Sequence, residues 1–98
     1  MNYLEQRNST DGRVSDQGSI VALDTKAGVV GFKLNDGTHV LAEQMSAGEL
    51  HQGQVLEGRM RTVGIEPLRD PQSGNVEDFF VLAYDLSLEA IQDALPGA

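Results

Sequence analysis

The stretch GVVGFKLNDGTHVLAE, residues 28–43, holds two β-like runs around an Asn-Asp-Gly sequence. Val30, Phe32 and Leu34 recur at every second position, which is the period of a strand with one buried face. Asn, Asp and Gly tolerate positive φ, so residues 35–37 are predicted to form a hairpin turn. The stretch therefore predicts a β-hairpin with Val30, Phe32 and Leu34 on one face.

The segments on either side of this hairpin continue the β pattern. The preceding run SIVALD predicts one more strand and hence a three-stranded meander. The link QMSAGELHQG (44–53) predicts one helical turn or a short 3₁₀ piece. The runs QVLEGRMRTVGIE (54–66) and VEDFFVLAYDL (76–86) predict a second, longer hairpin. Its pairing is expected to stop before Pro67 and to leave a projecting tip.

The end of the chain predicts a short helix. Ser87 can cap it, Glu89 suits its first turn, and Leu88, Ile91 and Leu95 form a stripe at helical spacing. With 98 residues the chain is expected to form one domain. We expect an all-β fold, a small five-stranded OB-like or SH3-like barrel over residues 18–86. A flexible tail is predicted over residues 1–17, and the helix and chain end over residues 87–98.

Charge and composition restrict the function. Seven Lys and Arg against fifteen Asp and Glu give a net charge of −8, which repels phosphate backbones and favours a basic partner. There is no cysteine, and no run approaches the roughly 18 apolar residues that cross a membrane. The first residues lack the apolar run of a signal peptide. The expected protein is cytoplasmic and has no membrane partner.

Three short segments resemble the cold-shock family of OB-fold proteins. Gly18-Ser19-Ile20 is similar to its first strand, Gly28-Val29-Val30-Gly31-Phe32 to its second, and Asp36-Gly37 with Val40-Leu41-Ala42-Glu43 to its third. The resemblance implies single-stranded nucleic-acid binding, in which bases stack on exposed rings. In this chain a single ring, Phe32, stands in these strands, and it alternates with Val30 and Leu34 as a core residue would. The stacking residues of the family are therefore absent.

Basic residues offer one candidate nucleic-acid contact. Arg59 and Arg61 are two apart, so a strand would place them on one face, where Lys33 or Lys26 could join them. The alternative is that the arginines pair with acidic residues across the sheet. The candidate contacts are Lys33, Arg59 and Arg61, and the candidate acidic pairing residues are Glu57, Glu66, Glu77 and Asp78.

No pattern of metal-binding or catalytic residues stands out. Four residues of strand separate His39 from Glu43 by roughly 13 Å, too far to share one ion. His51 has no cysteine or second histidine at ligand spacing. The chain has no Gly-x-Ser-x-Gly elbow, no phosphate-binding glycine loop and no cysteine nucleophile. We expect no catalytic residues, no metal and no cofactor.

The last predicted strand is apolar on both faces, which favours a binding role. One row consists of Phe80, Leu82, Tyr84 and Leu86, and the other of Phe79, Val81 and Ala83. A barrel needs only one row, so the row of Phe79 and Val81 is expected to be covered by the C-terminal helix, by a second copy or by a partner.

These observations favour a non-catalytic protein-interaction or accessory module. One alternative is a cold-shock-like single-strand binder, and another is an acidic inhibitor or immunity-type protein whose projecting tip engages a basic surface. The partner is expected to be another protein or a second copy, and nucleic acid is disfavoured by the charge. The candidate partner-contact residues are Glu66, Asp70, Glu77, Asp78, Phe79 and Val81.

Overall fold

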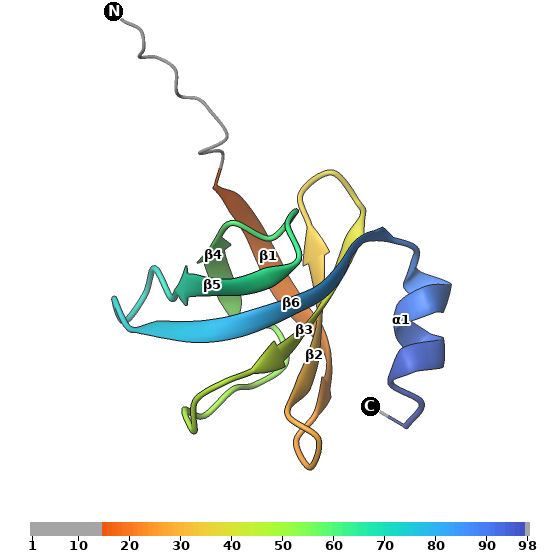
Figure 1. The fold of residues 1–98 in the computed structure, drawn as a ribbon, viewed down its shortest axis with the longest axis horizontal. Helices are drawn as coiled ribbons and strands as arrows, with labels where there is room; N and C mark the ends of the chain where they lie inside the picture. The colour runs from red at the N-terminus through yellow and green to blue at the C-terminus, as the bar shows by residue number, and fades with distance from the viewer. Residues whose placement is uncertain (1–14, 98) are drawn as a thin grey trace, which may run out of the picture.

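A computed structural model describes residues 15–97 as a closed antiparallel β-barrel with one short helix (Figure 1). The elements are β1 (Asp16–Asp24), β2 (Val29–Leu34), β3 (His39–Gln44), β4 (Val55–Gly58), β5 (Gly64–Arg69), β6 (Val76–Leu86) and α1 (Leu88–Ala94). Around the barrel the order is β1-β2-β3-β6-β5-β4, and β4 closes it against β1. The predicted all-β barrel with a C-terminal helix is confirmed. Of the tail predicted over residues 1–17, residues 1–14 lie outside the described part, and Asp16 and Gln17 already belong to β1.

The predicted meander is present as β1, β2 and β3. In the β2–β3 hairpin, Phe32 lies opposite Val40 and Gly31 lies opposite Leu41. The turn between them contains Gly37 at φ 91°, a backbone conformation that glycine adopts without steric cost. The predicted turn at residues 35–37 is therefore confirmed.

The predicted strand over residues 54–66 is wrong, and its division raises the strand count from five to six. Gly58 (φ 155°) and Gly64 (φ 131°) bound a loop between β4 and β5. The loop buries Met60 completely in the barrel core. A Cβ at Gly58 would lie 2.7 Å from the backbone oxygen of Pro67, so the close approach of the two strands here requires glycine.

Two other boundaries differ from the prediction. Pro67 lies inside β5, opposite Asp78 of β6. The ladder from β4 reaches only Leu68 and Arg69, so at Pro67 the strand has a neighbour on one side only, and a proline is tolerated as on an edge strand. The link over residues 45–53 contains no helix.

The barrel interior forms the main core. Phe32 and Phe79 meet there edge to face, with ring centroids 5.9 Å apart, and Val81 is completely buried beside them. The prediction that Phe79 and Val81 contact a partner is therefore wrong. Both rows of β6 are apolar, so alternation alone did not show which row faces inward.

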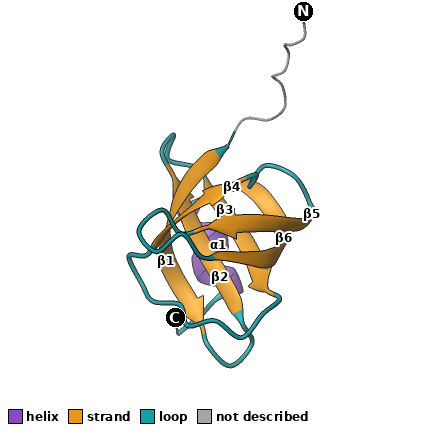
Figure 2. Ribbon diagram, turned by 90° about the vertical axis from the view of Figure 1, so that its left-hand side faces the viewer, coloured by secondary structure: helices purple, strands orange, loops and turns teal. Residues whose placement is uncertain are grey.

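Helix α1 packs on the outside of the barrel, on the side away from the viewer in Figure 2. Ser87 caps it by accepting a hydrogen bond from the N–H of Ala90, as predicted. Ile91 and Leu95 are buried against Ala22, whereas Leu88 is 46% exposed. The helix therefore covers the outer face of β1, β2 and β3, and not the face of β6 that was expected to need a cover.

Candidate functional site

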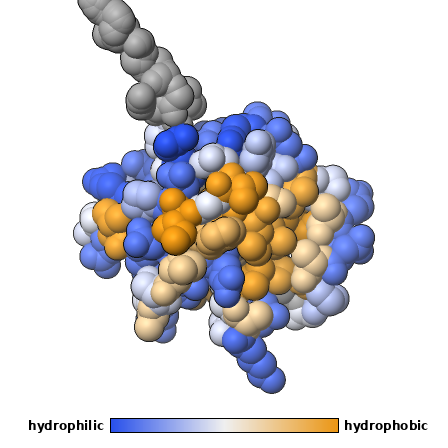
Figure 3. All heavy atoms as spheres, in the orientation of Figure 1, coloured by the Kyte–Doolittle hydropathy of each residue, from blue (hydrophilic) through white to orange (hydrophobic). Residues whose placement is uncertain are grey.

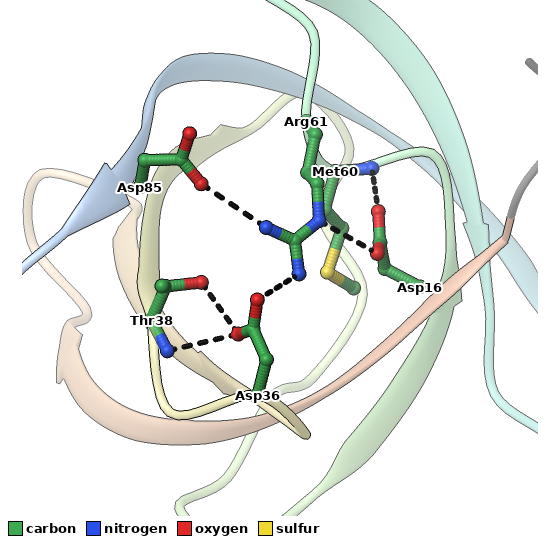
Figure 4. Close-up of polar contacts among 6 residues, drawn as sticks. All are labelled: Asp16, Asp36, Thr38, Met60, Arg61 and Asp85. Carbon is green, nitrogen blue, oxygen red and sulfur yellow. Dashed lines mark hydrogen bonds and ion pairs between the residues drawn. The ribbon is translucent and has the colours of Figure 1, made fainter.

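Arg61 is the centre of a polar cluster at one end of the barrel (Figure 4). It lies in the loop between β4 and β5, and its guanidinium donates to three carboxylates. Nε lies 3.1 Å from Oδ1 of Asp16, Nη2 lies 2.7 Å from Oδ2 of Asp36, and Nη1 lies 3.0 Å from Oδ1 of Asp85. The cluster therefore joins this loop to the start of β1, to the β2–β3 turn and to the end of β6.

The acidic partners of Arg61 are held by further hydrogen bonds. Oδ2 of Asp16 accepts from the N–H of Met60 at 3.2 Å, and Oδ1 of Asp36 accepts from the N–H and the hydroxyl of Thr38. The bonds from Thr38, and then the bond from Arg61, lower the pKa of Asp36 to about 2. Hydrogen bonds to Asp36 and Asp16 raise the pKa of Arg61. Three carboxylates against one guanidinium make this end of the barrel acidic.

The structure does not assemble the predicted basic stripe. Arg59 and Arg61 lie in a loop and not on a strand, while Lys33 is exposed on the outer face of β2. Each nitrogen of the Arg61 guanidinium already donates to a carboxylate. Pairing with acidic residues was the alternative prediction for this arginine, but its partners are not among the four residues named for it. Of those four, Glu57 pairs instead with Arg69 at 3.2 Å.

Helix α1 covers part of the β2–β3 hairpin, where the cold-shock resemblance would require exposed rings. Gly31 of β2 and Leu41 of β3 lie opposite each other on the outer face. A Cβ at Gly31 would lie 2.7 Å from Cγ2 of Ile91, so even a methyl group has no room beneath the helix. His39 on the same strand is also buried. The surface that would stack bases is therefore filled by the chain itself.

A cavity of about 350 Å³ opens at the other end of the barrel, between the link and the tip of the β5–β6 hairpin. Leu56, Leu68 and Phe79 form its apolar floor. Its polar lining includes Asp70 and Glu77, two of the candidate partner-contact residues. Glu66 and Asp78 do not line it. The other lining residues are Gly48, Glu49, Leu50, His51, Gln54, Ser73 and Asn75.

An apolar surface lies on the outside of the β5–β6 hairpin (Figure 3). We call it the β5–β6 face and define it by Val63, Ile65, Phe80, Leu82 and Tyr84. Ile65 lies opposite Phe80, and Phe80 stands between the core residues Phe79 and Val81 of its strand. Val63 and Ile65 are 60% and 57% exposed, and Leu82 and Tyr84 are each 39% exposed. Hydrophobic side chains therefore gather on this face without cover from the described chain.

The sequence prediction identified both rows of β6 but selected the inner one as the partner contact. The sequence did hold one signal for the outer row, in the predicted strand over residues 54–66, where Val63 and Ile65 alternate with Gly64 and Glu66. An apolar row on a neighbouring strand would have marked the row of Phe80 as part of a wider surface. The cavity carried no such signal, because it joins residues from the link, β4, β5 and β6.

The described part of the chain offers neither a cluster of metal ligands nor a helix that could span a membrane. Within residues 15–97 no three His, Asp or Glu side chains converge in a way that could hold a metal ion. Over the same residues, no helix has the length and apolar character needed to cross a membrane.

Comparisons with protein-family models, with curated proteins and with solved structures give no significant match to this chain.

Proposed function

We propose that this chain is a non-catalytic protein-interaction module that binds its partner through the β5–β6 face. The observation that carries the proposal is a contrast between two apolar outer surfaces of one barrel. On β1, β2 and β3 the outer surface is covered by Ile91 and Leu95 of α1. The β5–β6 face has no such cover from the described residues. Contiguous exposed apolar patches of this kind mark interaction sites more often than ordinary surface.

The charges around the face favour a basic protein over a second copy. Glu43 lies opposite Phe80 across the β3–β6 pair and is exposed, and Asp78 is exposed on β6 itself. Two copies meeting through this face would bring these acidic borders together, at a net charge of −8 each. A partner with an apolar centre and Lys or Arg at its border complements both features.

The barrel topology supports an OB-like assignment as part of the same proposal. A three-stranded meander, a link and a pair of strands that close the barrel follow one another in the order expected for that fold. The division of the fourth predicted strand into β4 and β5 is a local departure around Met60.

A photocrosslinking experiment in the source cells tests the proposed function. A benzoylphenylalanine at Leu82 is expected to give a discrete adduct with another protein, because this position lies in the centre of the face. The matched control carries the same group at Glu89, an exposed position on α1. Adding Ile65→Ser to the chain with the crosslinker at position 82 is expected to abolish the adduct. Equal adducts from both positions, no adduct, or only an adduct of twice the chain mass would overturn the proposal.

A further inference from the structure

The cavity at the hairpin tip combines an apolar floor with ordered carboxylates. Leu68 and Phe79 are completely buried beneath it, and Leu56 is nearly so. Its volume of about 350 Å³ lies in the range of small ligand sites, and the mouths of barrels are among the places where such sites occur. The cavity lies on the inner side of the hairpin, whereas the β5–β6 face lies on its outer side.

Asp70 is fixed on one side of the cavity in its charged form. Its Oδ2 accepts from Nε2 of Gln54 at 3.0 Å, and its Oδ1 accepts from the N–H groups of Gln72 and Ser73. The bond from Gln54, followed by the bond from Gln72, lowers the pKa of Asp70. A hydrogen bond from the side chain of Gln54 thus holds this carboxylate in place beside the cavity.

Glu77 also lines the cavity, and its neighbours hold it through only one of its oxygens. Oε1 accepts from Nε2 of Gln44 at 2.9 Å and from the hydroxyl of Ser46 at 2.8 Å. Among residues 15–97 no donor contacts Oε2. Gly48 packs directly against the carboxylate, and any Cβ at this position would collide with it. Glu77 is thus oriented by its neighbours and keeps one acceptor oxygen unused.

The ionisable lining is mostly acidic, which determines the kind of group that fits. Glu49, Asp70 and Glu77 line the cavity together with one imidazole, that of His51. These groups do not converge as a metal site within the described residues. An organic cation with an apolar stem matches the lining better, because its methylene groups can cover the floor while its charged end meets the carboxylates.

We propose that this cavity receives an Arg or Lys side chain from a protein partner, with its charged end between Glu77 and Asp70. The inference rests on the proposed function, because it names one chemical group of the partner. The partner would then make a second contact, on the inner side of the β5–β6 hairpin, in addition to its contact with the β5–β6 face on the outer side. Arg fits better than Lys, since its planar guanidinium can pair with a carboxylate through two hydrogen bonds.

Peptide titration followed by NMR tests this proposal with the intact chain. The probe is the capped peptide acetyl-Gly-Gly-Arg-Gly-Gly-amide, and the matched control has citrulline in place of arginine, which keeps the shape and removes the charge. The arginine peptide is expected to shift the amide signals of Gln54, Asp70 and Glu77. Capped arginine alone, as a second arm, shows whether the side chain is sufficient or the peptide backbone contributes.

Variants of single carboxylates complete the test. Glu77→Gln keeps an oxygen that can accept from Gln44 and Ser46, and it is expected to weaken binding about tenfold through loss of a charge-assisted bond. Asp70→Asn is the second variant, in case the first one perturbs the link. Glu89→Gln makes the same charge change on α1 and is expected to have no effect. Equal binding of the citrulline peptide, shifts elsewhere, or unchanged binding by both cavity variants would overturn the proposal. These results are independent of the crosslink from Leu82, so the two proposals can fail separately.

Discussion

Replacing Gly31 by alanine changes the free energy of unfolding, and the sign of that change depends on where α1 lies. Gly31 has an ordinary strand backbone, so alanine causes no strain in φ. On a free strand, the change would stabilise the fold by about 0.5–1 kcal/mol, because glycine loses more conformational freedom on folding. Beneath the helix, the new Cβ would lie 2.7 Å from Cγ2 of Ile91 and 3.5 Å from Cβ of Ala22. Overpacking of this kind typically costs about 1–3 kcal/mol, so a net destabilisation is expected.

The assay is urea or thermal unfolding of the single and double variants. For a domain of this size about 1 kcal/mol corresponds to a shift in Tm of about 4–8 °C, which is easily measured. Ile91→Ala removes the obstructing atoms, and in that background Gly31→Ala is expected to stabilise the protein. A double-mutant cycle thus reports the contact itself. A higher Tm for Gly31→Ala in the otherwise unchanged chain would refute the placement of α1 on this face.

Three further predictions concern the core, the polar cluster and nucleic acid. Val81→Lys buries an unpaired charge and is expected to unfold the protein, whereas Leu82→Lys on the outer face is expected to leave it folded, as circular dichroism would show. Because the pKa of Asp36 is lowered to about 2, its contribution to stability is present above about pH 4 and is lost as the pH falls toward 2. The variant Arg61→Met removes one of the bonds that lower this pKa, so acid unfolding curves are expected to show a smaller loss of stability over this range. Single-stranded oligonucleotides are expected to bind weakly or not at all at about 150 mM salt in fluorescence anisotropy, and sub-micromolar binding that is lost in Lys33→Ala would contradict this.

Local patterns were enough to predict most of the elements. The alternation of Val30, Phe32 and Leu34 defined a strand, residues 35–37 defined its turn, and Ser87 defined the start of α1. Each of these features depends on neighbours in the sequence. They were therefore readable without knowledge of the tertiary structure.

Features that depend on distant contacts were not predictable in the same way. The break between β4 and β5 exists because Met60 enters the core and Arg61 meets carboxylates up to 45 residues away. The inward row of β6 is decided by its pairing partners, since Phe79 and Phe80 are equally apolar. The cavity brings together residues from distant parts of the chain, among them Gln54 and Asp70, whose hydrogen bond no local pattern indicates.

Calorimetric titration of the protein captured at Leu82 tests the central claim most directly. We predict that it binds the unchanged chain with a negative heat-capacity change, the signature of apolar burial. The double variant Ile65→Ser, Leu82→Ser is predicted to bind at least about tenfold more weakly, with a Tm close to that of the unchanged chain, because both side chains are exposed before binding. Equal affinity for the folded double variant would contradict the assignment of the β5–β6 face as the binding surface.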